Sequence, residues 1–211
     1  LGADFGEFLN NSQIQRPFEL TPMVLTSGSW PNTGNNAFEE DTGPSVPPSL
    51  LTLCNHFLTF YRNVGQGKKL RWMHAYSHGT VKTACHFEKK RIYDLVVSQY
   101  QLCFLSMFNT GSDDDDPVVS FAEYLRATNS KDSAMAVRQL QPLLKVKLIV
   151  AEPGGDAPET QQSFRINPAF FNPNRKLTIL PVMTAAVGVT KEGGDESEQV
   201  QQKVKGERKF A

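Results

Sequence analysis

The pattern of hydrophobic and polar positions along the chain predicts helices and extended segments in alternation. Residues 1–16 carry apolar side chains near helical spacing up to Asn10 and the polar residues after it, which indicates the tail of a helix. Residues 18–30 alternate loosely and predict an extended segment, although Pro22 confines that point to a sheet edge. Residues 31–48 are rich in Asn, Gly, Pro and Ser and are typical of a surface loop.

A helix and a β-hairpin are expected next. Ser49 is in place to act as an N-cap, and apolar residues follow it at helical spacing until Gly65. The stretches 69–76 and 80–87 then read as extended, and Gly79 between them fits a turn. These two stretches are therefore predicted to pair with each other as a hairpin.

Two capping boxes mark the starts of further helices. A third extended stretch, 92–97, leads directly into Ser98, which has Gln101 three residues later. Ser120 with Glu123 repeats the same arrangement. Each serine is expected to cap a helix that begins at the next residue.

The order of the remaining elements is that of a winged helix. Apolar residues at helical spacing over 135–144 predict a third helix, and strands are expected at 148–151 and 163–167. Helix, helix, helix and a two-stranded wing is the winged-helix order. One more strand is expected at 176–182, and the polar, charged residues 183–208 are typical of a linker.

Composition narrows the class of protein. The 22 basic and 22 acidic residues cancel, so no overall field attracts nucleic acid or an anionic membrane. No apolar run approaches the roughly 20 residues needed to span a bilayer. Three cysteines among apolar neighbours do not form a disulfide framework, which favours a reducing compartment, the cytoplasm and nucleus. Because the chain begins at Leu1 rather than methionine, we expect it to be a fragment of a longer protein.

Candidate catalytic and metal sites are weak. His74 and His78 flank the predicted turn without a paired thiol, and no C-x-x-C pair occurs. No serine lies in a G-x-S-x-G context, and no glycine-rich turn is built to hold phosphate. We therefore expect no catalytic residue, no metal and no cofactor.

The predicted winged helix raises the alternative of DNA binding, since the third helix of that fold often enters the major groove. Arg138 and Lys145 would suit such a role, but the wing carries Glu152, Asp156 and Glu159 where phosphates would lie. The charges favour a winged helix that contacts protein. A purely structural module is compatible with the same charges.

Three stretches together resemble the cullin homology region, in the order and separation of that family. They are Val24-Leu25-Thr26-Ser27-Gly28-Ser29-Trp30-Pro31, Lys68-Lys69-Leu70-Arg71-Trp72 and Val97-Ser98-Gln99-Tyr100-Gln101. The first is the most specific, because it is similar to the V-L-[ST]-[ST]-G-x-W-P element that leads into the cullin α/β domain. The resemblance covers roughly residues 7–210.

The resemblance implies an α+β fold: a cullin homology α/β domain with a β-hairpin and an antiparallel sheet, followed by a winged helix. Residues 1–16 would end a helical bundle, 17–91 would form the α/β subdomain with its loop at 31–48, and 92–182 the winged helix with a returning strand. Residues 183–211 would be a linker toward a further winged helix. In cullins that further domain carries the lysine that receives the neddylation modifier, so no residue here is assigned that role.

The resemblance also implies a non-catalytic scaffold subunit of a cullin-RING ubiquitin ligase. The RING-box protein would add a strand to the α/β sheet and thereby position a ubiquitin-conjugating enzyme, and substrate adaptors would bind parts absent from this chain. The candidate contact residues are Val24, Leu25, Trp30, Leu70 and Trp72, which would serve equally as sheet core. No nucleic acid or membrane partner is expected. A winged-helix DNA-binding protein and a cullin-like subunit of the anaphase-promoting complex are the alternatives.

Two features depart from the cullin pattern. Pro142 falls within the predicted third helix, where proline removes a hydrogen bond and costs about 3 kcal/mol. A kink or an early helix end is expected there. The loops at 31–48 and 110–117 are longer than the family pattern suggests.

Overall fold

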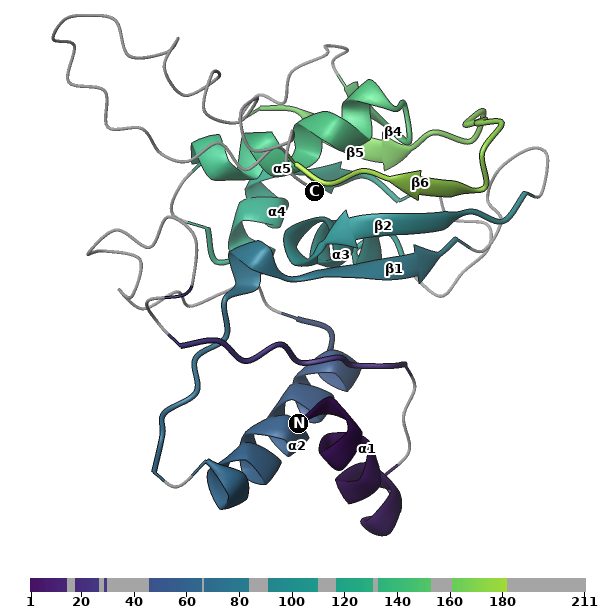
Figure 1. Cartoon of the computed structure of the whole chain (residues 1–211). Helices are drawn as coiled ribbons and strands as arrows, with labels where there is room; N and C mark the ends of the chain where they lie inside the picture. Colours follow the sequence, from purple (N-terminus) through teal and green to yellow (C-terminus); the bar gives the residue numbers. More distant parts are fainter. Residues whose placement is uncertain are drawn as a thin grey trace, which may run out of the picture.

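Helices and two three-stranded sheets make up the described part of the chain (Figure 1). The computed structural model describes residues 1–14, 18–26, 29, 46–65, 67–83, 91–109, 117–130, 133–152 and 161–181. The helices are α1 (Gly2–Asn11), α2 (Pro48–Val64), the 3-10 helix η2 (His74–Tyr76), α3 (Gln99–Ser106), α4 (Phe121–Ala127) and α5 (Ser133–Lys145). The strands are β1 (His78–Lys82), β2 (Asp94–Ser98), β3 (Val119–Ser120), β4 (Ile149–Glu152), β5 (Ser163–Ile166) and β6 (Lys176–Thr178). The predicted α+β class is confirmed.

The first sheet has the strand order β1-β2-β6, with β2 in the centre. β1 runs antiparallel to β2, with His78 opposite Ser98, and β6 runs parallel to β2 on the other side. Leu95 and Val97 of β2 are almost completely buried. A strand this apolar belongs in the middle of a sheet, which leaves β1 and β6 at the edges.

The second sheet has the order β3-β5-β4, and both of its strand pairs are antiparallel. Along the chain this sheet follows α3, and α4 and α5 lie between β3 and β4. Figure 1 shows these helices beside the second sheet, with α1 and α2 apart from it at the opposite end of the molecule. The chain therefore has a sheet-rich part and a two-helix part.

Both predicted capping boxes are confirmed. The Ser98 hydroxyl accepts the Gln101 backbone N–H at 3.2 Å, and the Gln101 side chain accepts the Ser98 N–H at 2.9 Å. In the second box, the Ser120 hydroxyl accepts the Glu123 backbone N–H at 3.2 Å, and the Glu123 side chain accepts the Ser120 N–H at 2.8 Å. The Ser120 backbone N–H, followed by its hydroxyl, lowers the pKa of the Glu123 carboxyl, because both hydrogen bonds favour the charged form. As predicted, α3 and α4 begin one residue after each serine.

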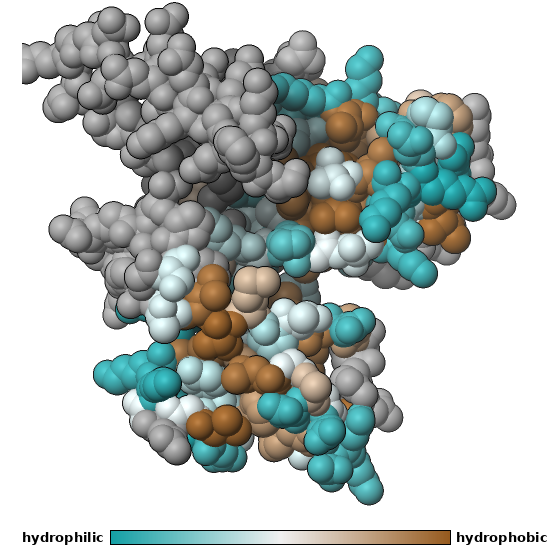
Figure 2. Space-filling view, viewed as in Figure 1, coloured by the Kyte–Doolittle hydropathy of each residue, from teal (hydrophilic) through white to brown (hydrophobic). Residues whose placement is uncertain are grey.

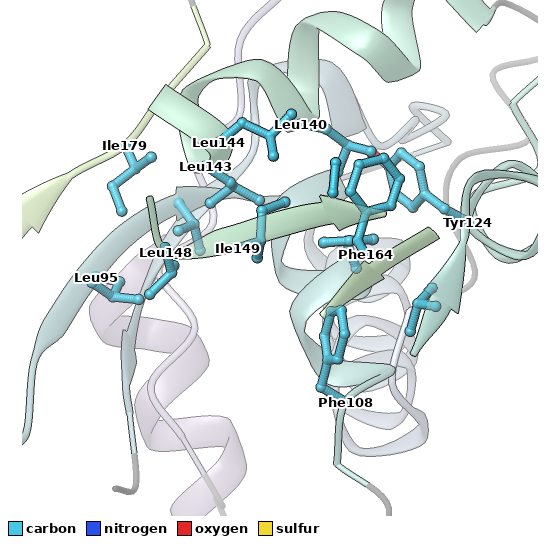
Figure 3. Packing of buried hydrophobic residues seen from close by; sticks show 14 of the residues in the cluster. Leu95, Phe108, Tyr124, Leu140, Leu143, Leu144, Leu148, Ile149, Phe164 and Ile179 are labelled. Carbon is cyan, nitrogen blue, oxygen red and sulfur yellow. The ribbon is translucent and has the colours of Figure 1, made fainter. Parts of the chain in front are cut away.

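Two separate hydrophobic clusters stabilise the two parts. The larger one joins β2, α3, α4, α5 and the second sheet, and Figure 3 shows its side chains converging from these elements. The smaller one lies between α1 and α2 and is largely aromatic; its buried members are Phe5, Leu9, Leu53, Phe57, Phe60 and Tyr61. Residues up to Trp72 pack on the smaller cluster, and Val81 onward on the larger. The two cores therefore divide between 72 and 81, and residue 91, the predicted boundary, lies between the paired strands β1 and β2.

Tyr124 offers a test of the larger core. Its ring is completely buried against Phe104, but no described residue hydrogen bonds its hydroxyl. Burial also raises the pKa of this phenol far above its usual range. A buried, unpaired hydroxyl costs roughly 1–3 kcal/mol, so Tyr124→Phe should raise the free energy of unfolding by about 1 kcal/mol or more, measured by urea denaturation. Tyr93→Phe is the control, since the Tyr93 hydroxyl accepts the Asn172 N–H at 3.1 Å and its loss should destabilise.

Two strand predictions were wrong. Residues 69–76 do not pair with 80–83, the described part of the predicted strand 80–87. They form irregular chain and the 3-10 helix η2, while β1 pairs with β2 instead. Gly79, expected in a turn, lies within β1 opposite Val97. The segment 18–26, expected as a sheet strand, pairs with none of the described strands. The pairing of β1 with β2 buries Leu95 and Val97 in the larger core, whereas 18–26 packs on the smaller one; local alternation encodes neither outcome.

The helix α5 does not end at Pro142. It runs on to Lys145, because Leu143 and Leu144 are buried in the larger core and hold the last turn. The helix then closes through Lys147, which has a left-handed φ of 59°. The Leu148 N–H bonds the Leu143 carbonyl at 3.0 Å, which satisfies a carbonyl that the helix end leaves free.

Candidate partner-binding site

The segment 18–26 is an extended chain lying on the smaller cluster. Its side chains alternate strictly between half-buried and exposed: Phe18, Leu20, Pro22 and Val24 are half-buried, and Glu19, Thr21, Met23 and Leu25 are exposed. Phe18, Leu20 and Val24 pack against the aromatic residues of α1 and α2. In the view of Figure 1 this purple segment crosses between α2 and β1. A period of two residues is that of a β-strand with one face covered.

No described strand pairs with the backbone of this segment. Within the described residues, positions 19–25 make no hydrogen bond, and the segment closes in a turn where the Ser29 N–H bonds the Thr26 carbonyl at 2.9 Å. Pro22 has no N–H, so the other residues carry the free donors. An extended chain with unpaired backbone groups is a template for a further strand.

The outer edge of β1 is a second edge without a partner among the described strands. Hydrogen bonds from Gln99 to the Ser77 carbonyl at 2.9 Å and from Thr83 to the Tyr93 carbonyl at 3.0 Å flank its ladder with β2. In an antiparallel pair such bonds occur at every second residue, so the odd-numbered residues of β1 face β2. The backbone N–H and C=O groups of His78, Thr80 and Lys82 therefore point outward. No described strand lies on that side.

Leu70 and Trp72 lie in the irregular chain that joins the two parts. Both are half-buried and pack against the smaller cluster, and the Trp72 ring lies 5.7 Å from that of Phe57. The Trp72 indole N–H is buried and has no hydrogen-bond partner among the described residues. This places the two residues beside the helices rather than in a hairpin, and η2 then leads the chain into β1.

The five predicted contact residues thus fall into three groups. Val24, Leu70 and Trp72 are brought together on the smaller cluster and have a packing role. Leu25 is 42% exposed and is free to contact a partner. Trp30 lies outside the described residues. Figure 2 shows hydrophobic side chains on this face of the lower part of the molecule, and among the described residues Met23 is the most exposed large hydrophobic, at 75%.

Sequence reasoning missed the outer edge of β1 as a candidate site. Its signal was present in the alternation from His78 to Lys82, where polar residues occupy the even positions and Gly79 and Val81 the odd ones. The assignment of Gly79 to a turn concealed this pattern, because it divided the strand.

The histidines and cysteines gather into no metal site in the described residues, where no group of three or more potential ligands occurs. His74 Nδ1 lies 3.1 Å from the Gln99 side-chain oxygen, an arrangement that joins η2 to α3. Burial raises the pKa of both Cys54 and Cys103 to about 11, so these thiols stay protonated near neutral pH. Among the described helices none has the length and apolar character to cross a bilayer.

Comparison with known sequences identifies the family. The family model of the cullin alpha+beta domain matches residues 24–170, which is well over half of the chain. This chain belongs to the cullin family. The matched region of this cullin chain begins inside the extended segment 18–26 and includes both strands β1 and β2.

Similar sequences lie within full-length cullins. The cullin chain is 31% identical to Cullin-1 of Dictyostelium discoideum over 82% of its length, and 30% identical to Cullin-4A of Mus musculus over 79%. It is 26% identical to Cullin-5 of Dictyostelium discoideum over its whole length. The chain spans only 20–26% of the length of these relatives.

Proposed function

We propose that this cullin chain is a non-catalytic part of a ubiquitin ligase scaffold, and that it holds a RING-box protein by strand addition. The observation that carries the proposal is the pair of unpaired strand edges, one along residues 18–26 and one on β1. An extended segment of the partner would form main-chain hydrogen bonds with these edges, and its alternate side chains would fill neighbouring pockets.

The flanking structure suits a rigid platform. The segment 18–26 packs on the aromatic cluster of α1 and α2, while β1 is joined to the larger core through its pairing with β2. A bound RING domain would be tethered to both. It would recruit a ubiquitin-conjugating enzyme, and the scaffold would contribute proximity by raising the effective concentration of ubiquitin near a substrate.

We also propose that α3, α4, α5 and the second sheet form a winged helix that contacts protein. The element order and the antiparallel arrangement β3-β5-β4 support this assignment. On the wing, Arg165 forms an ion pair with Glu152 at 2.9 Å, which reduces the positive charge available to phosphates. The predicted linker at 183–211 lies outside the described residues.

The proposal is tested by co-expressing the 211-residue chain with an intact RING-box protein or with one that lacks its N-terminal strand, followed by pull-down. Capture of the intact partner alone would support strand addition. Capture of both would point to another contact, and failure to capture either by a folded chain would overturn the proposal and return DNA binding to consideration.

Thr80→Pro sharpens the test, because it removes one N–H from the outer edge of β1. The Thr80 N–H points away from β2, so proline at this edge position leaves the β1–β2 hydrogen bonds in place. We expect the dissociation constant for the RING-box protein to rise about tenfold or more, since a hydrogen bond is lost and the proline ring obstructs the edge.

Thr80→Val is the matched control for this variant. It keeps the N–H and a β-branched side chain of similar size, and it should bind like the parent chain. Calorimetry measures both affinities, and the melting temperature reports whether the proline variant stays folded. Equal binding by a folded Thr80→Pro chain would show that this edge is not used.

A further inference from the structure

Gly79 is an unusual residue for its place in the fold. It lies in the middle of the short edge strand β1, where glycine is unfavourable because it gains no side-chain packing and loses much backbone freedom. Its φ is not positive, so the backbone does not require glycine. An added Cβ would meet no atom within 4 Å, so packing within this chain does not require glycine either.

The open space at Gly79 lies on the core-facing side of the sheet. Gly79 is opposite Val97, and residues directly opposite in an antiparallel pair share a face. Val97 is completely buried in the larger core, and Val81, two residues along β1, packs against the same core. The inner face of β1 therefore has a notch at its outer edge, bounded by Val81 and Val97.

We propose that Gly79 is a specificity-determining residue, and that its notch receives a large apolar or aromatic side chain from the strand that a RING-box protein adds to β1. This rests on the proposed function. Gly79 lies between His78 and Thr80, whose backbone groups point to the free edge and would bond the incoming strand. The partner residue directly opposite Gly79 then places its side chain over the glycine and covers the edge of the larger core. Aromatic side chains pack in this way on a glycine of a neighbouring strand.

The variant Gly79→Val tests this assignment, because it fills the notch without a clash inside the chain. We expect its melting temperature to equal or exceed that of the parent, since valine favours strands and the space is open. The dissociation constant for a RING-box protein should rise about tenfold or more, because the two side chains would overlap. Gly79→Ala adds less volume to the notch and should show a smaller rise.

A reciprocal change in the partner identifies the occupant. Each large apolar residue of the partner's N-terminal strand is changed in turn to alanine, and binding is measured to the parent chain and to Gly79→Val. One such change should weaken binding to the parent but improve binding to Gly79→Val, which is the signature of a direct contact.

The outcomes separate this inference from the proposed function. If the parent chain does not bind the RING-box protein, the proposed function fails. If the parent binds and the folded Gly79→Val chain binds equally well, strand addition stands and the role of Gly79 is overturned. If Gly79→Val weakens binding but no partner change compensates, the notch does not receive a side chain and the inference is likewise overturned.

Discussion

Replacing Phe104 with alanine should lower the free energy of unfolding by about 3–5 kcal/mol. Phe104 is completely buried in α3, and its ring contacts Tyr124, Phe108 and Phe164 with centroid distances of 5.0, 5.2 and 5.8 Å. Tyr124 comes from α4, Phe108 from the turn that follows α3, and Phe164 from β5. Removing the ring therefore opens a cavity at the place where three elements meet, and urea denaturation followed by circular dichroism measures the loss.

Phe171→Ala is the control for this prediction. The Phe171 side chain is 51% exposed, so its removal leaves no enclosed cavity and should change stability by less than about 1 kcal/mol. A similar small loss for Phe104→Ala would contradict the packing described here, because it would mean that the three rings close over the gap or were never in contact.

The sequence predicted those elements whose hydrogen bonds are local. The Ser98 and Ser120 boxes each close within four residues, so the starts of α3 and α4 were visible without knowledge of the fold. The end of α1 near Asn11 was visible for the same reason. Pro142 shows the limit of local reasoning, because the burial of the neighbouring leucines extends α5 past a residue that disfavours the helix.

Strand pairing could not be predicted in the same way. Residues 69–76 and the stretch 92–97 both read as extended, and the predicted hairpin paired 69–76 with 80–87. The choice falls on β2 because Leu95 and Val97 complete the larger core only when β2 is central. The candidate site depends on that choice, since an outer edge exists only once its strand has paired on the other side.

The assignment of the candidate contact residues to a partner stays a prediction, because the structure shows only which of them are buried. Val24, Leu70 and Trp72 were selected as apolar residues in extended chain, and such residues serve a core as readily as a partner. Leu25 faces the side of the segment opposite to Val24, so it is exposed where Val24 is half-buried. Its exposure became evident once the aromatic cluster of α1 and α2 had fixed which side is covered.

Gln101→Met should cost about 2–5 kcal/mol and should loosen the chain that follows β6. The Gln101 side chain is completely buried and joins three elements: its amide donates to the Gln139 and Ile179 carbonyls, each at 2.8 Å, and its oxygen accepts the Ser98 N–H. Methionine keeps the length and volume of the side chain but forms none of these bonds. The buried Ser98 N–H and Ile179 carbonyl would then be left without this partner.

Gln139→Met is the matched control, because the Gln139 side chain accepts one hydrogen bond from the described residues, that of the Ser98 hydroxyl at 2.6 Å. It should cost about 1–2 kcal/mol and leave Ile179 held. Hydrogen exchange distinguishes the two variants: the amide of Ile179, which bonds the Val96 carbonyl at 2.9 Å, should exchange faster in Gln101→Met and unchanged in Gln139→Met. Equal protection in both would mean that β6 is held by its ladder alone. Faster exchange only in Gln101→Met would mean that one buried side-chain amide fixes the position of Ile179, where the chain leaves β6.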